Sequence, residues 1–172
     1  MQMIWLDATT VDTYLERLCA LLGEAVESGA SIGFMLPINY AEVTAYWHDV
    51  ADSVRHQKKH LLVVVDAKSQ VIGTAQLEPS PKENGRHRAE VQKVIVANAV
   101  RRQGIGTLMM EQLDLKAKQL QRSMLFLDTR VGDAGEHLYV KSGWQKFGVA
   151  PDYAYSPNGE LEGSAFYYKK LA

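Results

Sequence analysis

Apolar residues recur at helical spacing in three long segments of the chain. From residue 9 to residue 27 they fall three or four positions apart, at Val11, Leu15, Leu18, Leu22 and Val26. This spacing places them on one face of an α-helix. The same pattern predicts helices over about residues 40–57 and from residue 105 to about residue 120. A fourth, shorter helix is expected around Leu138, because Gly143 suits the position that follows a helix C-terminus.

Short apolar runs predict the strands between these helices. Residues 61–65 and 71–77 flank a polar turn, which is typical of a β-hairpin. A strand at 89–97, the helix from residue 105 and an apolar run at 124–128 predict two parallel strands joined by a right-handed crossover. The other expected strands are 4–6, one from about residue 144 and one through 165–168. We therefore predict an α/β fold with a mixed sheet of about seven strands, antiparallel in its N-terminal part and parallel at its centre, flanked by about four helices.

Composition and charge fit one globular domain over residues 1–172. The chain is 47% hydrophobic and 23% charged, with a net charge of −1, as is usual for a domain with a single core. This charge gives no reason to expect binding to nucleic acid or to an anionic membrane. No apolar run reaches the length of about twenty residues that spans a bilayer, and Met1–Asp7 lacks the basic region of a signal peptide. We therefore expect a cytoplasmic protein.

No metal site is expected. The five histidines do not complete a zinc-type motif. The single cysteine, Cys19, lies among leucines and is interpreted as a buried spacer rather than a nucleophile.

A basic turn with two glycines lies between the predicted strand 89–97 and the helix from residue 105. Arg101 and Arg102 come first, and Gly104 and Gly106 follow. A helix N-terminus presents unpaired backbone N–H groups and partial positive charge, so it binds phosphate readily. The glycines would let a phosphate approach the backbone, and the guanidinium groups would neutralise charge at the rim. The turn therefore predicts a pyrophosphate site.

The same turn lacks the features of the common nucleotide loops. Gly106 is followed by neither the Lys-Ser/Thr pair of a nucleoside triphosphate loop nor the third glycine of a dinucleotide fingerprint. An ordinary strand-to-helix turn, with glycine used only for tight packing, remains an open interpretation of these residues.

Two segments resemble signatures of the GCN5-related N-acetyltransferase (GNAT) superfamily. The first is the turn 101–106, which fits the pattern Arg/Gln-x-x-Gly-x-Gly/Ala after an apolar strand; the second is 138–144, a helix with a tyrosine that ends at a Gly-aromatic pair. The resemblance implies acetyl-coenzyme A (acetyl-CoA) as cosubstrate. It also implies a binding set of Ile95, Val96, Arg101, Arg102, Gln103, Gly104, Ile105, Gly106 and Thr107. Two positions depart from the pattern, because Arg102 and Gly132 stand where members commonly have glycine and asparagine.

A narrower resemblance points to catalytic residues. Segments 29–35, 89–93, 127–129 and 156–159 are similar to the tabtoxin-resistance members of this superfamily, which acetylate an amino-acid-like β-lactam toxin. This resemblance implies catalytic roles for Glu90, Asp128 and Tyr139 and a small-molecule amine as acceptor. It implies possible toxin or antibiotic resistance as the biological role.

The chemistry of acetyl transfer suits these three side chains. An amine with a pKa of about 8 to 10.4 is largely protonated at neutral pH, so some group must accept its proton. In the absence of a bulge, strand alternation places Glu90, Gln92, Val94 and Val96 on one face, so Glu90 could meet Asp128 of the neighbouring strand. A tyrosine hydroxyl stays protonated and can donate to a departing thiolate.

Each of these residues also has a structural interpretation. Glu90 could be a solvated or salt-bridged strand residue, Asp128 a turn former at a strand end and Tyr139 a core aromatic. The alternative function that follows is a non-catalytic acyl-CoA sensor or interaction module. For the acceptor, Phe34, Trp47, Tyr153 and Tyr155 either enclose a compact pocket or belong to the core. A compact pocket would favour a small amine over a peptide.

Overall fold

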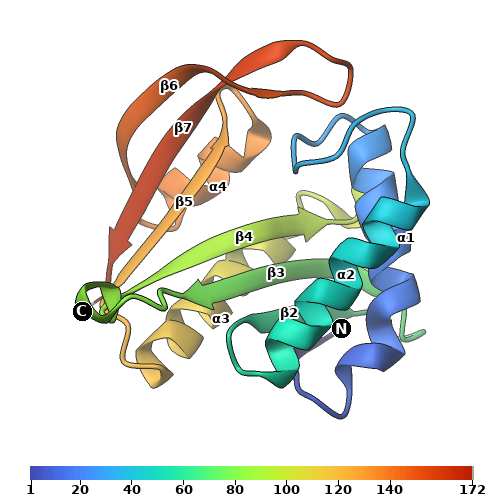
Figure 1. Ribbon diagram of the computed structural model, residues 1–172, viewed down its shortest axis with the longest axis horizontal. Coiled ribbons are helices and arrows are strands. Elements are labelled where there is room, and N and C mark those ends of the chain that lie inside the picture. The colour runs from blue at the N-terminus through green and yellow to red at the C-terminus, as the bar shows by residue number, and fades with distance from the viewer. Residues whose placement is uncertain (172) are drawn as a thin grey trace.

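The computed structural model describes residues 1–171 as a seven-stranded sheet flanked by helices (Figure 1). The strand order is β1-β2-β3-β4-β5-β7-β6. The strands are β1 (Gln2–Leu6), β2 (His60–Val65), β3 (Val71–Pro79), β4 (Arg88–Val96), β5 (Met124–Arg130), β6 (Gln145–Tyr155) and β7 (Leu161–Lys170). The α-helices are α1 (Leu15–Glu27), α2 (Tyr40–Arg55), α3 (Ile105–Gln119) and α4 (Ala134–Lys141). Strands β4 and β5 are parallel and the other neighbours antiparallel, which confirms the predicted fold class.

The sheet has an apolar core on each face. Leu61 and Val63 of β2 point to the core beneath α1 and α2, whereas Leu62 and Val64 point to the core that α3 covers. Strand β2 therefore reads as a continuous apolar run, since it is covered on both faces. Burial of each such side chain stabilises the fold by about 1.5–3 kcal/mol. The core beneath α3 holds this helix against the sheet.

A β-bulge interrupts β4. Opposite Thr74 and Gln76 of β3, the register passes from Ile95 to Gln92, so β4 carries one extra residue there. Lys93 lies at the bulge with a φ of +50°. The extra residue reverses the alternation of side chains. Val94 and Val96 consequently pack on the α3 face. The expectation that they share a face with Glu90 and Gln92 is wrong for this reason.

Strands β4 and β5 pair over a short length and then part. Their register runs only from Arg88 opposite Met124 to Glu90 opposite Phe126. Beyond these pairs the two strands diverge, as Figure 1 shows. The divergence opens the middle of the sheet beside the N-terminus of α3.

The sequence predicts neither a membrane-spanning helix nor a metal site. Across residues 1–171, no helix is long and apolar enough to cross a bilayer. Over the same range, no three His, Cys, Asp or Glu side chains gather where they could hold a metal ion. His56 and His60 are four residues apart, but His56 caps α2 and His60 begins β2.

Candidate active site

A cavity of about 1150 Å³ opens where β4 and β5 part. Its lining comes from the loop after α1, from β4, from the turn before α3, from the end of β5 with the start of α4, and from the β6–β7 hairpin. Typical pockets for a single small ligand occupy about 300–1,000 Å³. The cavity therefore has room for a large cosubstrate together with a small acceptor.

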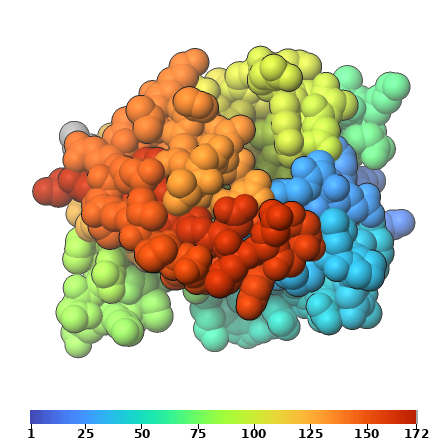
Figure 2. All heavy atoms as spheres, turned by 90° about the horizontal axis from the view of Figure 1, so that it is seen from above, coloured from blue at the N-terminus to red at the C-terminus, as the bar shows by residue number. Residues whose placement is uncertain are grey.

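The β6–β7 hairpin meets the loop between α1 and α2 on one side of this cavity (Figure 2). The backbone N–H of Leu36 donates to the carbonyl of Pro157 at 3.0 Å. Tyr153 and Tyr155 of the hairpin line the cavity. Phe34 and Trp47 belong to the core beneath α1 and α2 instead. Two of the four aromatic residues considered for an acceptor pocket thus lie at the site.

The turn before α3 has the properties of an anion site. Helix α3 begins at Ile105, after Gly104 in the left-handed conformation with a φ of +84°. No side chain caps its first turn within the described residues, so the backbone N–H groups there are open to a ligand. A Cβ on Gly104 would meet no protein atom within 4 Å. The turn thus fits the pyrophosphate that acetyl-CoA would bring.

Eight of the nine predicted cosubstrate residues line the cavity. They are Ile95, Val96, Arg101, Arg102, Gly104, Ile105, Gly106 and Thr107. Gln103 is exposed and does not line it. Arg102 has a φ of +61°, a conformation that costs a non-glycine residue about 1 kcal/mol or more. This backbone geometry explains why glycine suits the position where this chain has arginine.

Gly106 and Gly104 serve different purposes. A Cβ on Gly106 would lie 3.0 Å from Cδ2 of Leu138, so glycine here lets α3 pack closely against α4. This contact favours the packing interpretation for Gly106, which also lines the cavity. The open surroundings and positive φ of Gly104 favour the ligand-binding interpretation for that position.

Glu90, Asp128 and Tyr139 all line this cavity, from β4, β5 and α4 respectively. Within residues 1–171, Glu90 forms no salt bridge. Asp128 lies inside β5 rather than in a turn, and its Oδ2 accepts a hydrogen bond of 2.7 Å from the Ser164 hydroxyl. The turn-former interpretation of Asp128 is therefore wrong. Both carboxylates are placed to meet a ligand in the cavity.

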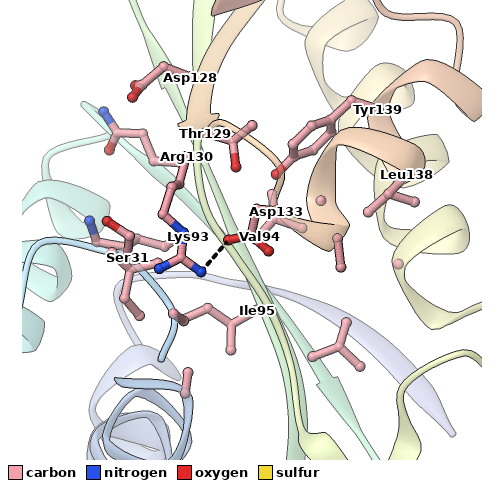
Figure 3. A pocket seen from close by; sticks show the side chains of 18 of the residues that line it. Ser31, Lys93, Val94, Ile95, Asp128, Thr129, Arg130, Asp133, Leu138 and Tyr139 are labelled. Carbon is pink, nitrogen blue, oxygen red and sulfur yellow. Dashed lines mark ion pairs between the residues drawn. The ribbon is translucent and has the colours of Figure 1, made fainter. Parts of the chain in front are cut away.

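Tyr139 is both a core residue and a cavity residue. Its side chain is 7% exposed, and its ring packs against Trp144 and Tyr167 with centroids 6.1 and 5.9 Å apart. Figure 3 shows the hydroxyl pointing toward the end of β5. Burial raises the pKa of the Tyr139 hydroxyl well above its usual range, and the negative charges of Asp133 and Asp128 add to this. The hydroxyl therefore keeps its proton at neutral pH.

Several cavity residues were not predicted from the sequence, and three of them carry polar groups of interest. Tyr46 of α2, Lys93 at the bulge and Arg130 at the end of β5 also line the cavity. Arg130 is paired, because Nη2 lies 3.6 Å from Asp133 Oδ2 and Nη1 donates to Ser156 Oγ at 3.0 Å (Figure 3). The bulge that turns Lys93 depends on strand register, for which the local sequence carries no signal.

Comparisons with known proteins agree with this geometry. A family model described as an acetyltransferase (GNAT) domain matches residues 57–150. Among solved structures, ribosomal-protein-alanine N-acetyltransferase from Brucella melitensis is 22% identical with a TM-score of 0.77, over 99% of this chain and 100% of that chain. The protein yncA from Salmonella typhimurium, solved with its cofactor acetyl-CoA, is 16% identical with a TM-score of 0.76, over 100% and 94%. Aminoglycoside 6'-acetyltransferase type Ii is 17% identical with a TM-score of 0.76, over 100% and 98%. These likenesses show a shared fold, and the narrower likeness to tabtoxin-resistance proteins stays a prediction.

Proposed function

Since the chain belongs to the GNAT acetyltransferase family, we propose that it transfers an acetyl group from acetyl-CoA to the amine of a small molecule. One observation carries the proposal. The uncapped N-terminus of α3 and the carboxylates of Glu90 and Asp128 open on the same cavity. An anion site and two proton acceptors in one cavity suit a phosphate-bearing acyl donor and an amine acceptor.

The turn and β4 would hold the cosubstrate. The backbone N–H groups of residues 103–107 would bind the pyrophosphate, and Arg102 would neutralise part of its charge. Ile95 and Val96 would line the path of the thioester arm. Acetyl-CoA supplies the acetyl group as a thioester.

Glu90 or Asp128 would take the proton of the acceptor. An amine that arrives as an ammonium ion must lose a proton before it can act as a nucleophile. Both carboxylates line the cavity, so either can accept this proton directly or through water. The Ser164 hydroxyl orients one oxygen of Asp128.

Tyr139 would act as a hydrogen-bond donor. Its raised pKa keeps the proton on the hydroxyl oxygen. A thiol has a pKa of about 8.5, so full transfer of the proton from this tyrosine to a thiolate is unfavourable. We therefore expect Tyr139 to stabilise developing negative charge on sulfur by a hydrogen bond, a modest contribution.

The acceptor in this proposal is a small, amino-acid-like or antibiotic-like amine. The hydrogen bond between Leu36 and Pro157 joins the loop after α1 to the β6–β7 hairpin beside the cavity, which favours a compact acceptor site over the open groove that a long peptide would need. Tyr153 and Tyr155 add aromatic surface to the acceptor side.

Two measurements test the proposed function. Acetyl-CoA is titrated calorimetrically against ATP and NADH, and acetyl transfer is followed as thiol release with amino acids, polyamines, aminoglycosides, β-lactam toxins and peptides. We expect binding of acetyl-CoA in preference to both nucleotides, and turnover of a small amine. Equal binding of all three nucleotides would refute the acyl donor, and peptides acetylated far better than every small amine would refute the acceptor class.

The substitution Tyr139→Phe separates an enzyme from an acyl-CoA sensor. The ring and its packing remain, so the fold and the dissociation constant for acetyl-CoA should not change. Loss of one hydrogen bond to a charged group, about 1.5–3 kcal/mol, predicts a kcat about 10- to 100-fold lower. Thiol release by both proteins is compared at saturating acetyl-CoA. A sensor would show no turnover in the parent protein with any amine.

A further inference from the structure

The β-bulge turns the side chain of Lys93 into the side of the cavity away from α3, where the acceptor would bind. Its φ of +50° and the extra residue in β4 direct it to the face on which α2 packs. Nζ lies over the ring of Tyr46, 5.4 Å from the centroid. Figure 3 shows Lys93 beside Ser31 of the loop after α1. The positive φ carries a backbone cost of about 1 kcal/mol or more, which the bulge sustains at the cavity.

The loop after α1 lies close to this ammonium group. Gly33 has a φ of +93°, and a Cβ there would lie 3.7 Å from Lys93 Nζ. Ser31 and Gly33 both line the cavity. The ammonium group is thus enclosed between the loop, α2 and β4 on the side of the cavity away from α3.

Lys93 differs from two other partly buried cations, Lys59 and Arg130, in having no counter-ion among residues 1–171. Lys59 Nζ lies 3.1 Å from Glu78 Oε2 and donates to Gln92 Oε1 at 2.9 Å. Arg130 is paired with Asp133. Over residues 1–171, Lys93 Nζ has no carboxylate oxygen within 4.0 Å.

The electrostatics of the cavity agree with this geometry. Burial lowers the pKa of the Lys93 ammonium, and the positive charge of Lys59 lowers it further. The carboxylates of Asp128 and Glu90 act in the opposite direction and raise this pKa. An anion beside Nζ would remove the cost of an unpaired buried charge.

We propose that Lys93 binds an anionic group of the acceptor, so that the substrate carries a carboxylate or a similar oxyanion as well as the reacting amine. The inference rests on the proposed function and adds the substrate's second charge to it. Glu90 and Asp128 lie on the same cavity and suit the ammonium end of such a molecule. Lys93 suits its anionic end, and Ser31 supplies a hydroxyl donor in the loop beside it. The cavity therefore selects a zwitterion of the α-amino-acid type.

The test compares matched pairs of acceptors. The standard α-amino acids and their α-carboxamides present the same side chains, with and without the negative charge. Removal of that charge lowers the pKa of the amine, so more of the carboxamide is neutral at a given pH. Without a role for the anion, the carboxamide should react at least as fast. We expect the best amino acid to have a KM about 10- to 100-fold lower than that of its carboxamide.

The variant Lys93→Met removes the charge and keeps an unbranched apolar side chain. We expect it to raise the KM of the amino acid about 10- to 100-fold, with kcat nearly unchanged, and to leave the KM of the carboxamide unaltered. Lys93→Arg should recover most of the affinity. Lys68→Met, at the exposed tip of the β2–β3 hairpin, removes the same charge outside the cavity and should change neither KM.

Three results would overturn the proposal. In the first, Lys93→Met changes the KM of the amino acid and the KM of its carboxamide equally, or changes neither. In the second, acetyl-CoA alone acetylates Lys93, detected by peptide mass mapping, since the amine would then be a target and not an anion binder. The third concerns binding alone, measured as the thermal shift that amino acid and carboxamide cause in the presence of CoA. Equal shifts would overturn the proposal, whereas an absence of turnover with a larger shift from the amino acid would overturn only the proposed function.

Discussion

The double variant Glu90→Gln, Asp128→Asn is expected to acetylate amines about 100- to 10,000-fold more slowly than the parent protein, because it lacks a proton acceptor beside the substrate. Both substitutions keep the size and shape of the side chain, and both residues lie at the cavity surface rather than in a packed core. Acetyl-CoA affinity should therefore be retained. The measurement is kcat from thiol release, with the dissociation constant of acetyl-CoA determined alongside.

The single variants assign the role of each carboxylate. The variant with the larger loss identifies the base, and its rate should continue to rise with pH until the amine loses its proton to solvent, at about pH 8 to 10. Glu83→Gln removes an exposed carboxylate outside the cavity and serves as the matched control, with no expected change. A double variant as active as the parent protein would show that the two carboxylates only shape the cavity.

Replacing Gly104 with valine is expected to weaken acetyl-CoA binding by about 100-fold or more. The φ of +84° disfavours a β-branched residue, so the turn would move and misalign the N–H groups of the first turn of α3. Each hydrogen bond to a charged phosphate contributes about 1.5–3 kcal/mol, so two lost bonds suffice for this effect. Calorimetric titration of the folded variant measures it.

The variant Gly159→Val is the control for the backbone strain that Gly104→Val introduces. Gly159 has a φ of +87° in the β6–β7 turn, with no protein atom within 4 Å of a Cβ. It should lose a similar amount of stability and keep its affinity for acetyl-CoA. A folded Gly104→Val variant with the parent's affinity would show that the turn is only structural. Gly106→Val is expected to destabilise the packing of α3 on α4 as well, because its Cβ would meet Leu138.

The order and type of the main elements could be predicted from the sequence because their signals are local. Helical spacing in 9–27 and 105–120 and the apolar runs of β2 and β5 depend only on neighbouring positions. The turn 101–106 is equally local, since glycine conformation and the free N–H groups of a helix start act over a few residues. Glu90, Asp128 and Tyr139 came from resemblance to a family rather than from local pattern, and the structure places all three on one cavity.

The sequence by itself determined the α/β architecture and the glycine-bearing turn before α3, whereas the tertiary structure decided which residues line the rest of the cavity. Strand alternation misplaced Val94 and Val96, because the bulge at Lys93 arises from the register of β4 against β3. Tyr153 and Tyr155 line the cavity, whereas Phe34 and Trp47 pack in the core beneath α1 and α2, and contacts such as that of Leu36 with Pro157 join segments far apart in the chain. Strand register and such contacts depend on the packing of distant residues, which local periodicity does not encode. For the same reason, the position of the Lys93 ammonium group in the cavity is apparent only in the folded chain.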